Sequence, residues 1–146
     1  MNIIKTDGTI EFEKASFFVK PALTKNEFIS SRIGSNSRLI LSNSEYSSFS
    51  VSLSDTAGDL GVSLRFDGQQ IDSLGIEKMD ATKNWNNWSE MAEQDKKSEY
   101  DQLLVNILGS PPYVFEWGEI TSSFDPRSGS SSICIRYNRK SSQNKN

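Results

Sequence analysis

Carboxylates are the main groups in this chain that could carry acid–base chemistry, because its 146 residues include no histidine. Without imidazole, Ser-His and Cys-His nucleophiles and histidine-ligated zinc sites are excluded. The most suggestive carboxylate pair is Glu116 and Glu119, on either side of Trp117 and Gly118. Residues three apart on a regular strand point to opposite faces, so the pair would converge only if Gly118 formed a bulge. We therefore expect no catalytic residues and no enzyme activity; a carboxylate-based enzyme is the least favoured alternative.

Other sites for ions or cofactors have little support in the sequence. The single cysteine, Cys134, can form neither an internal disulfide nor a thiolate cluster. The serines around Gly129 could present backbone amides to an anion. However, they lead into an alternating strand rather than a helix and lack the lysine of a Walker motif. We expect a hairpin turn there, and neither a metal nor a cofactor.

The charge is unevenly distributed along the chain. Residues 85–125 contain eight acidic residues and only Lys96 and Lys97 as bases, a net charge of −6, whereas residues 127–146 contain five bases and no acid. An acidic segment repels nucleic acid and attracts a basic partner. The alternative is that these acids form an ordinary solvated helix face. We expect no direct contact with nucleic acid.

The three tryptophans, Trp85, Trp88 and Trp117, lie close to this acidic segment. Stacking on nucleic-acid bases is disfavoured because the surrounding charge has the wrong sign. The favoured interpretation is structural, with Trp88 at the entrance of a helix and Trp117 covering the core. The alternative is an exposed aromatic anchor in a protein interface, where tryptophan is enriched.

Periodicity predicts one long amphipathic helix over about residues 88–108, with Asn87 or Ser89 as its N-cap and Gly109 and a proline pair as its stop. We expect its polar side, with Glu90, Glu93, Lys97 and Asp101, to face solvent, with pairs Glu93–Lys97 and Lys97–Asp101. Its apolar side should face a sheet through Ala92, Leu103, Leu104, Ile107 and Leu108.

Alternation of apolar and polar residues predicts strands on both sides of this helix. Five or six are expected before residue 80, with turns at Asp7-Gly8 and Asp67-Gly68. Residues 39–41 suggest another strand, and residues 25–31 are ambiguous. After the helix, residues 113–124 are expected to be extended and to return through a turn at 125–129 into a strand over 130–137.

Together these elements predict an α+β fold: a curved antiparallel sheet or partial barrel of six to eight strands with one long amphipathic helix. We expect residues 1–138 to form one domain and residues 139–146 a disordered polar tail. No apolar run approaches the roughly 18 residues of a membrane span. The lone cysteine, and the absence of a signal-peptide apolar stretch after Met1, favour a cytoplasmic location.

Three segments of the last third of the chain, within residues 85–137, carry a resemblance: Trp85–Glu90, Phe115–Ile120 and Phe124–Ile133. They resemble small bacterial proteins, some of which are similar to the immunity proteins of contact-dependent growth inhibition and other polymorphic toxin systems. Immunity proteins are small, cytoplasmic, often acidic and non-enzymatic, and they inhibit by binding a cognate toxin domain. The class shares no motif, so no residue role is carried over.

The resemblance implies a cytoplasmic immunity protein that binds and blocks a cognate toxin domain, such as a nuclease. The alternative, in a different class, is a small-ligand-binding α+β module. Charge and aromatic content suggest the residues that would contact a protein partner: Glu90, Glu93, Asp101, Glu116, Trp117 and Glu119.

Overall fold

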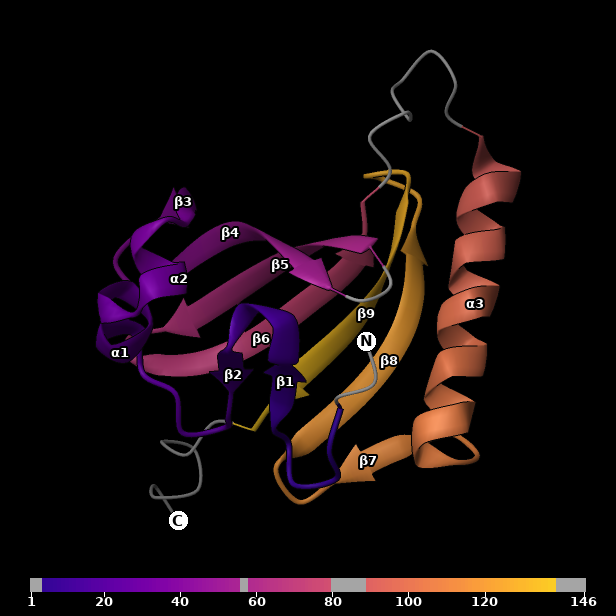
Figure 1. The fold of residues 1–146 in the computed structure, drawn as a ribbon, viewed down its shortest axis with the longest axis horizontal. Helices are drawn as coiled ribbons and strands as arrows, with labels where there is room; N and C mark the ends of the chain where they lie inside the picture. Colours follow the sequence, from indigo (N-terminus) through magenta and orange to yellow (C-terminus); the bar gives the residue numbers. More distant parts are fainter. Residues whose placement is uncertain (1–3, 56–57, 80–88, 139–146) are drawn as a thin grey trace.

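The computed structural model describes residues 4–55, 58–79 and 89–138 and has an α+β fold, as predicted (Figure 1). Seven antiparallel strands form one open sheet in the order β3-β4-β5-β6-β9-β8-β7, and β1 and β2 form a separate small sheet. The strands are β1 (Ile10–Phe12), β2 (Phe17–Val19), β3 (Arg38–Ser42), β4 (Tyr46–Asp55), β5 (Gly58–Asp67), β6 (Gln70–Lys78), β7 (Tyr113–Phe115), β8 (Gly118–Asp125) and β9 (Ser130–Tyr137). The helices are η1 (Glu13–Ala15), α1 (Lys25–Ser30), α2 (Arg32–Ser35) and α3 (Glu90–Leu108).

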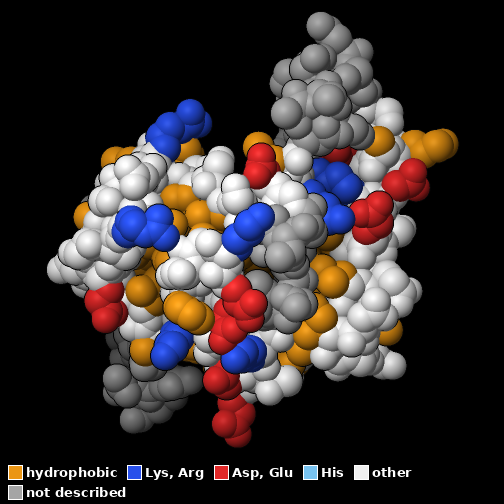
Figure 2. Space-filling view, viewed as in Figure 1, with side chains coloured by type: hydrophobic (Ala, Val, Ile, Leu, Met, Phe, Trp, Pro, Cys, Tyr) orange, Lys and Arg blue, Asp and Glu red, His pale blue; other side chains and the backbone are white. Residues whose placement is uncertain are grey.

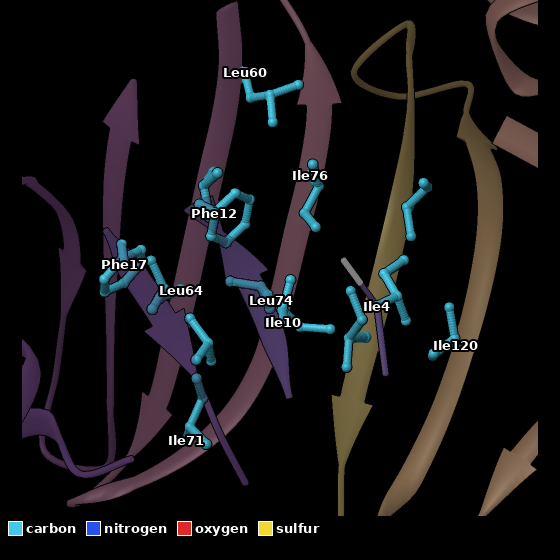
Figure 3. Packing of buried hydrophobic residues seen from close by; sticks show 14 of the residues in the cluster. Ile4, Ile10, Phe12, Phe17, Leu60, Leu64, Ile71, Leu74, Ile76 and Ile120 are labelled. Atoms are coloured by element: carbon cyan, nitrogen blue, oxygen red, sulfur yellow. The ribbon is translucent and has the colours of Figure 1, made fainter. Parts of the chain in front are cut away.

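One face of the large sheet is apolar and carries the core. The alternating residues of β4 to β6 place large side chains on this face, and the small sheet and α1 cover part of it (Figure 1). Figure 3 shows Ile10, Phe12 and Phe17 of the small sheet in front of Leu64 and Leu74 of the large one. Burying such a side chain contributes about 1.5–3 kcal/mol relative to leaving it exposed. The opposite face of β4 and β5 is rich in serine and is more open to solvent.

The predicted turns at Asp67-Gly68 and at residues 125–129 each join two antiparallel strands, as expected. Gly68, with a φ of +59°, follows Asp67 in the tight turn between β5 and β6, and Gly129, with a φ of +68°, ends the turn between β8 and β9. The turn at Asp7-Gly8 also forms, with an antiparallel bridge between Ile4 and Ile10 and a hydrogen bond of 2.9 Å from the Lys5 N–H to the Thr9 carbonyl oxygen; residues 1–3 lie outside the described ranges. On its other side, β1 pairs with β2.

The long helix begins and ends close to the predicted residues. The Ser89 hydroxyl caps α3 by accepting the Ala92 backbone N–H at 3.0 Å, and Gly109 ends it with a φ of +85°. Leu104 is buried as predicted, and the predicted Lys97–Asp101 ion pair is present at 2.9 Å. None of the helices in the described ranges is long and apolar enough to cross a membrane.

The prediction that Glu93 faces solvent is wrong. Its residue is only 5% exposed, and its carboxylate lies 3.3 Å from Lys96 on the same helix rather than pairing with Lys97. The reason is an opening in the sheet, since β6 and β9 pair only over Ser73–Ile76 and Ile133–Arg136. Beyond this point the Ser131 N–H donates to the Glu93 carboxylate at 3.0 Å. The Glu93 side chain of α3 thus accepts the backbone hydrogen bond that a neighbouring strand would otherwise accept from Ser131.

The segment predicted as one extended stretch over residues 113–124 is a tight hairpin. β7 and β8 pair from Tyr113–Ile120 to Phe115–Gly118, so Glu116 and Trp117 form the two-residue turn. Gly118 is therefore the first residue of β8 and not a bulge. A Cβ at Gly118 would lie 2.0 Å from the Arg136 carbonyl oxygen, which explains glycine at this position.

Candidate functional site

An apolar groove lies between α3 and the β7–β8 edge of the sheet, with a volume of about 480 Å³. We call it the edge groove. Its apolar lining comes from both sides and from the connection between them: Leu104, Val105, Pro111, Pro112, Tyr113, Val114 and Ile120. Its polar lining consists of Asp101, Glu119, Thr121 and Ser122.

The short length of β7 creates this groove. β7 begins at Tyr113, and the preceding Pro112 has no backbone N–H with which to extend the ladder. Within the described ranges, no strand pairs with β8 on that side beyond Ile120. The Tyr113 hydroxyl donates to the Gly109 carbonyl at 2.8 Å and so joins the start of β7 to the end of the helix. The groove is therefore built by fixed elements.

Backbone groups of β8 point into the edge groove. Phe115 and Gly118 flank the two-residue turn, and in such a hairpin the flanking residues exchange backbone hydrogen bonds. Because the direction of these bonds alternates along an antiparallel strand, Ser122 directs its backbone N–H and C=O away from β9 and toward the groove. An extended segment of another protein could pair with this edge.

Asp101 is held in a fixed position on the wall of the groove. Its carboxylate accepts a hydrogen bond from the Ser122 hydroxyl and another from Lys97 Nζ at 2.9 Å. Partial burial acts to raise the pKa of Asp101, but these two hydrogen bonds outweigh it and lower the pKa below its ordinary value. The Asp101 carboxylate is thus ionised at neutral pH and tied to the sheet.

Glu119 brings a second carboxylate to the groove from β8. Its side chain is exposed, and in the strand ladder Glu119 lies opposite Arg136 of β9. Asp101 and Glu119, predicted as separate parts of an acidic surface, therefore line the same groove from different elements. No lysine or arginine is among the residues that line it.

The other predicted contact residues lie elsewhere. Glu90 is exposed in the first turn of α3, about 16 Å along the helix axis from Asp101 at 1.5 Å per residue. Figure 2 shows acidic side chains on this N-terminal half of α3. Glu116 is exposed in the β7–β8 turn. Because Glu93 is buried, it cannot contact a partner and does not belong to the candidate site.

Trp117 is tied to the interior. Its indole N–H donates to the Thr6 carbonyl oxygen at 2.8 Å, and its ring stacks on Phe115 with the centroids 5.1 Å apart. A Cβ placed on Gly8 would lie only 2.8 Å from the Trp117 ring. These contacts agree with the structural interpretation of Trp117. Trp85 and Trp88 lie outside the described residues, as does the predicted tail.

No protein-family model matches the chain, and no significant match was found to a curated protein or to a solved structure. The function must therefore be argued from the site alone.

Charged groups between α3 and β6 serve the fold rather than the groove. Lys96 lies 3.3 Å from the Glu93 carboxylate and 3.8 Å from that of Glu77 on β6. Burial raises the pKa of Glu77, the attraction of Lys96 partly offsets this rise, and repulsion from Glu93 adds to it.

Among the described residues, no group of three or more carboxylate or thiol side chains could hold a metal ion.

The apolar half of the edge groove was not predicted from the sequence. Val105 is 41% exposed and Val114 69% exposed, and each looked like an ordinary member of a helix or strand. The one feature of the sequence that could have indicated the groove is the pair Pro111-Pro112 directly before β7. Proline cannot donate to a strand ladder, so pairing stops there and the edge of β8 is left open.

Proposed function

We propose that this chain is an immunity-type inhibitor that binds a basic toxin domain through the edge groove. One observation supports the proposal above all: an apolar groove with an open strand edge is flanked by the carboxylates of Asp101 and Glu119. The proposed occupant is an extended loop of the toxin that carries an apolar residue beside a lysine or arginine.

Exposed apolar side chains supply the first part of this argument. Val105 on α3 and Val114 on β7 line the groove from separate elements and are both exposed in the free chain. A partner that covers them gains about 25 cal/mol for each Å² of apolar surface removed from water. An apolar side chain of the partner, placed between the two valines, would form the centre of the contact.

Charge supplies the second part. Asp101 is ionised, and its hydrogen bonds with Ser122 and Lys97 hold its side chain in one position. Binding of a partner therefore does not have to order this side chain. Enzymes that act on nucleic acids bind phosphates with lysine and arginine. A carboxylate pair beside an apolar groove complements such a basic surface, so docking here would cover the residues that the toxin uses for its substrate.

The proposal predicts that a gene adjacent to the gene for this chain encodes a basic toxin domain, and the test is neutralisation of that domain. We expect the purified chain to bind that domain and to abolish its activity. Val105→Arg and Val114→Arg should weaken binding at least tenfold, because each places a cation in the groove. Phe18→Arg is the matched control, since Phe18 is exposed on β2 and outside the groove.

Three results would count against the proposal: no binding of this toxin domain, equal binding by the groove and control variants, or binding without loss of toxin activity. Circular dichroism and thermal melting of each variant separate a lost contact from a lost fold. A small molecule that fills the groove and excludes the toxin would instead favour the ligand-binding alternative.

A further inference from the structure

The face of the large sheet that points away from the core, which we call the outer face, contains a hollow of about 280 Å³. We call it the serine hollow. Its floor consists of two neighbouring rows of residues across β4, β5 and β6: Ser52, Gly61 and Glu77, and Ser50, Ser63 and Gly75. Ser130 and Ser132 of β9 complete it on the far side. The serine hollow shares no lining residue with the edge groove, so it is a separate feature of the fold.

Two glycines give the serine hollow its depth. A Cβ placed on Gly75 would lie 2.7 Å from the Ser63 hydroxyl oxygen, and one placed on Gly61 would lie 2.8 Å from the Met79 sulfur. The Met79 side chain therefore lies over Gly61 and adds an apolar wall to the hollow. A larger residue at either glycine would fill the hollow or displace one of its lining side chains.

Several hydroxyls in the serine hollow are available to a ligand. Within the described ranges, the structure gives no side-chain hydrogen bond to four of the lining serines: Ser50, Ser52, Ser63 and Ser132. A serine hydroxyl can donate one hydrogen bond and accept two. These side chains can therefore bind a ligand that itself carries hydroxyl groups.

Glu77 brings a carboxylate to the same hollow. It alternates with the buried Ile76, so its side chain lies on the outer face. Lys96 of α3 approaches the Glu77 carboxylate across the opening between β6 and β9, but it stays 3.8 Å away and lies closer to Glu93, at 3.3 Å. Among these three side chains, one ammonium is thus shared by two carboxylates. No lysine or arginine is among the described residues that line the hollow, so Glu77 can accept a further cation.

We propose that the serine hollow binds a small amine that carries hydroxyl groups. Its ammonium lies against the Glu77 carboxylate, where a charge-assisted hydrogen bond supplies what the distant Lys96 does not. Its hydroxyls exchange hydrogen bonds with the serines, and its carbon skeleton packs against Met79. A simple alkyl amine or an uncharged polyol would use only part of this lining. The site is independent of the proposed function.

Three compounds with the same three-carbon skeleton test the proposal on the full chain at neutral pH. Serinol carries an ammonium between two hydroxyls, glycerol has a hydroxyl in place of the ammonium, and isopropylamine lacks both hydroxyls. We expect serinol to bind with a Kd of about 1–10 mM. Glycerol and isopropylamine should each bind about tenfold more weakly or worse. The NMR shifts of the Gly61 and Gly75 amides report binding, and Gly68, outside the hollow, is the reference.

Two matched pairs of variants locate the binding. Glu77→Gln keeps the size of the side chain and should weaken serinol binding about tenfold or more, with little effect on glycerol. Asp59→Asn is its control, since it removes an equal charge from an exposed position outside the hollow. Ser52→Phe should abolish binding by filling the hollow, whereas Ser54→Phe, exposed two residues further along β4, should not. Circular dichroism and thermal melting show whether each variant remains folded.

Equal binding of serinol and glycerol would overturn the proposal, because the ammonium would then have no part in recognition. Equal binding of serinol and isopropylamine would overturn it for the hydroxyls. The absence of any shift at Gly61 and Gly75 with serinol, or equal losses in a folded variant and its control, would also contradict it. None of these results bears on toxin binding, so the two proposals can fail independently.

Discussion

The Glu93 carboxylate on α3 accepts a hydrogen bond of 3.0 Å from the backbone N–H of Ser131 on β9. In the opposite direction, the Ser131 hydroxyl donates to the Glu93 backbone carbonyl at 2.5 Å. This reciprocal pair joins the helix to the sheet where β6 and β9 separate. On the other side of the opening, the Lys78 N–H donates to the Tyr100 hydroxyl at 2.8 Å. Two side chains of α3 thus satisfy backbone groups that the opening leaves without a strand partner.

Replacing Glu93 by alanine should lower the free energy of unfolding by about 1–3 kcal/mol, because a buried N–H then loses its acceptor. Glu93→Gln keeps an acceptor oxygen and should cost less. Glu90→Ala is the control, since Glu90 is exposed in the first turn of the same helix and should contribute about 1 kcal/mol at most. Urea denaturation measures all three. Equal losses for Glu93→Ala and Glu90→Ala would show that the Ser131 contact is not stabilising.

Leu104 anchors the C-terminal half of α3 in the core. Replacing it by alanine should cost about 2–5 kcal/mol, because the cavity left behind cannot fully close. The neighbouring residue provides the control: Val105 is 41% exposed, and Val105→Ala should change stability by about 0.5 kcal/mol. Thermal or urea unfolding separates the two variants. A similar loss for both would mean that the helix does not pack on the sheet through Leu104.

The buried tyrosines predict a loss of stability in alkali. Burial raises the pKa of Tyr100 from 10.0 to about 12, although the hydrogen bond from the Lys78 N–H opposes this rise. Unfolded chains lose the phenol proton near pH 10, whereas the folded chain retains it until about pH 12. The unfolded state therefore binds fewer protons in this window, and the free energy of unfolding falls as the pH rises.

Tyr100→Phe should flatten this decline, and Tyr137→Phe should do the same, because burial also raises the pKa of Tyr137. Urea unfolding of the wild type and both variants at a series of alkaline pH values measures the slopes. If either variant declines as steeply as the wild type, its phenol does not stay protonated in the folded state. At neutral pH, Tyr100→Phe should still cost about 0.5–1.5 kcal/mol for the lost hydrogen bond.

Local patterns were sufficient to predict most strands and the long helix. Alternation in β4 and β5 and the turn at Asp67-Gly68 are visible within a few residues, and the fold class follows from them. The burial of Glu93 was not predictable in this way. It depends on the separation of β6 from β9, more than 50 residues apart in the sequence, and a helix acid beside lysines otherwise suggests a solvated face.

The β7–β8 hairpin shows a second limit. Glu116-Trp117 lacks the Asn-Gly or Asp-Gly signature of a two-residue turn, so the sequence suggests a continuous strand. The fold favours the turn because Trp117 packs on Phe115 and Tyr137. Because the edge groove forms between this hairpin and α3, the meeting of Asp101 and Glu119 could not be predicted either.

The charges of the edge groove predict the kinetics of toxin binding. Association with a basic partner should be fast and should slow as salt is added, because salt screens charges beyond about 10 Å at 0.1 M. The pair Asp101→Asn and Glu119→Lys should slow association about tenfold, with a smaller effect on dissociation if both carboxylates lie at the rim of the contact. Asparagine is chosen at position 101 because it can still accept the Ser122 hydrogen bond.

A second acidic pair provides the matched control. Glu90→Lys and Glu116→Lys change the net charge of the chain by more than the groove pair does, but at exposed positions outside the groove. If general attraction alone governed binding, this control pair would slow association more than the groove pair. If the groove is the docking site, the groove pair must have the larger effect despite its smaller charge change. Stopped-flow measurements at low and high salt distinguish the two, and a wild-type rate that does not vary with salt would show that the acidic residues have no part in the encounter.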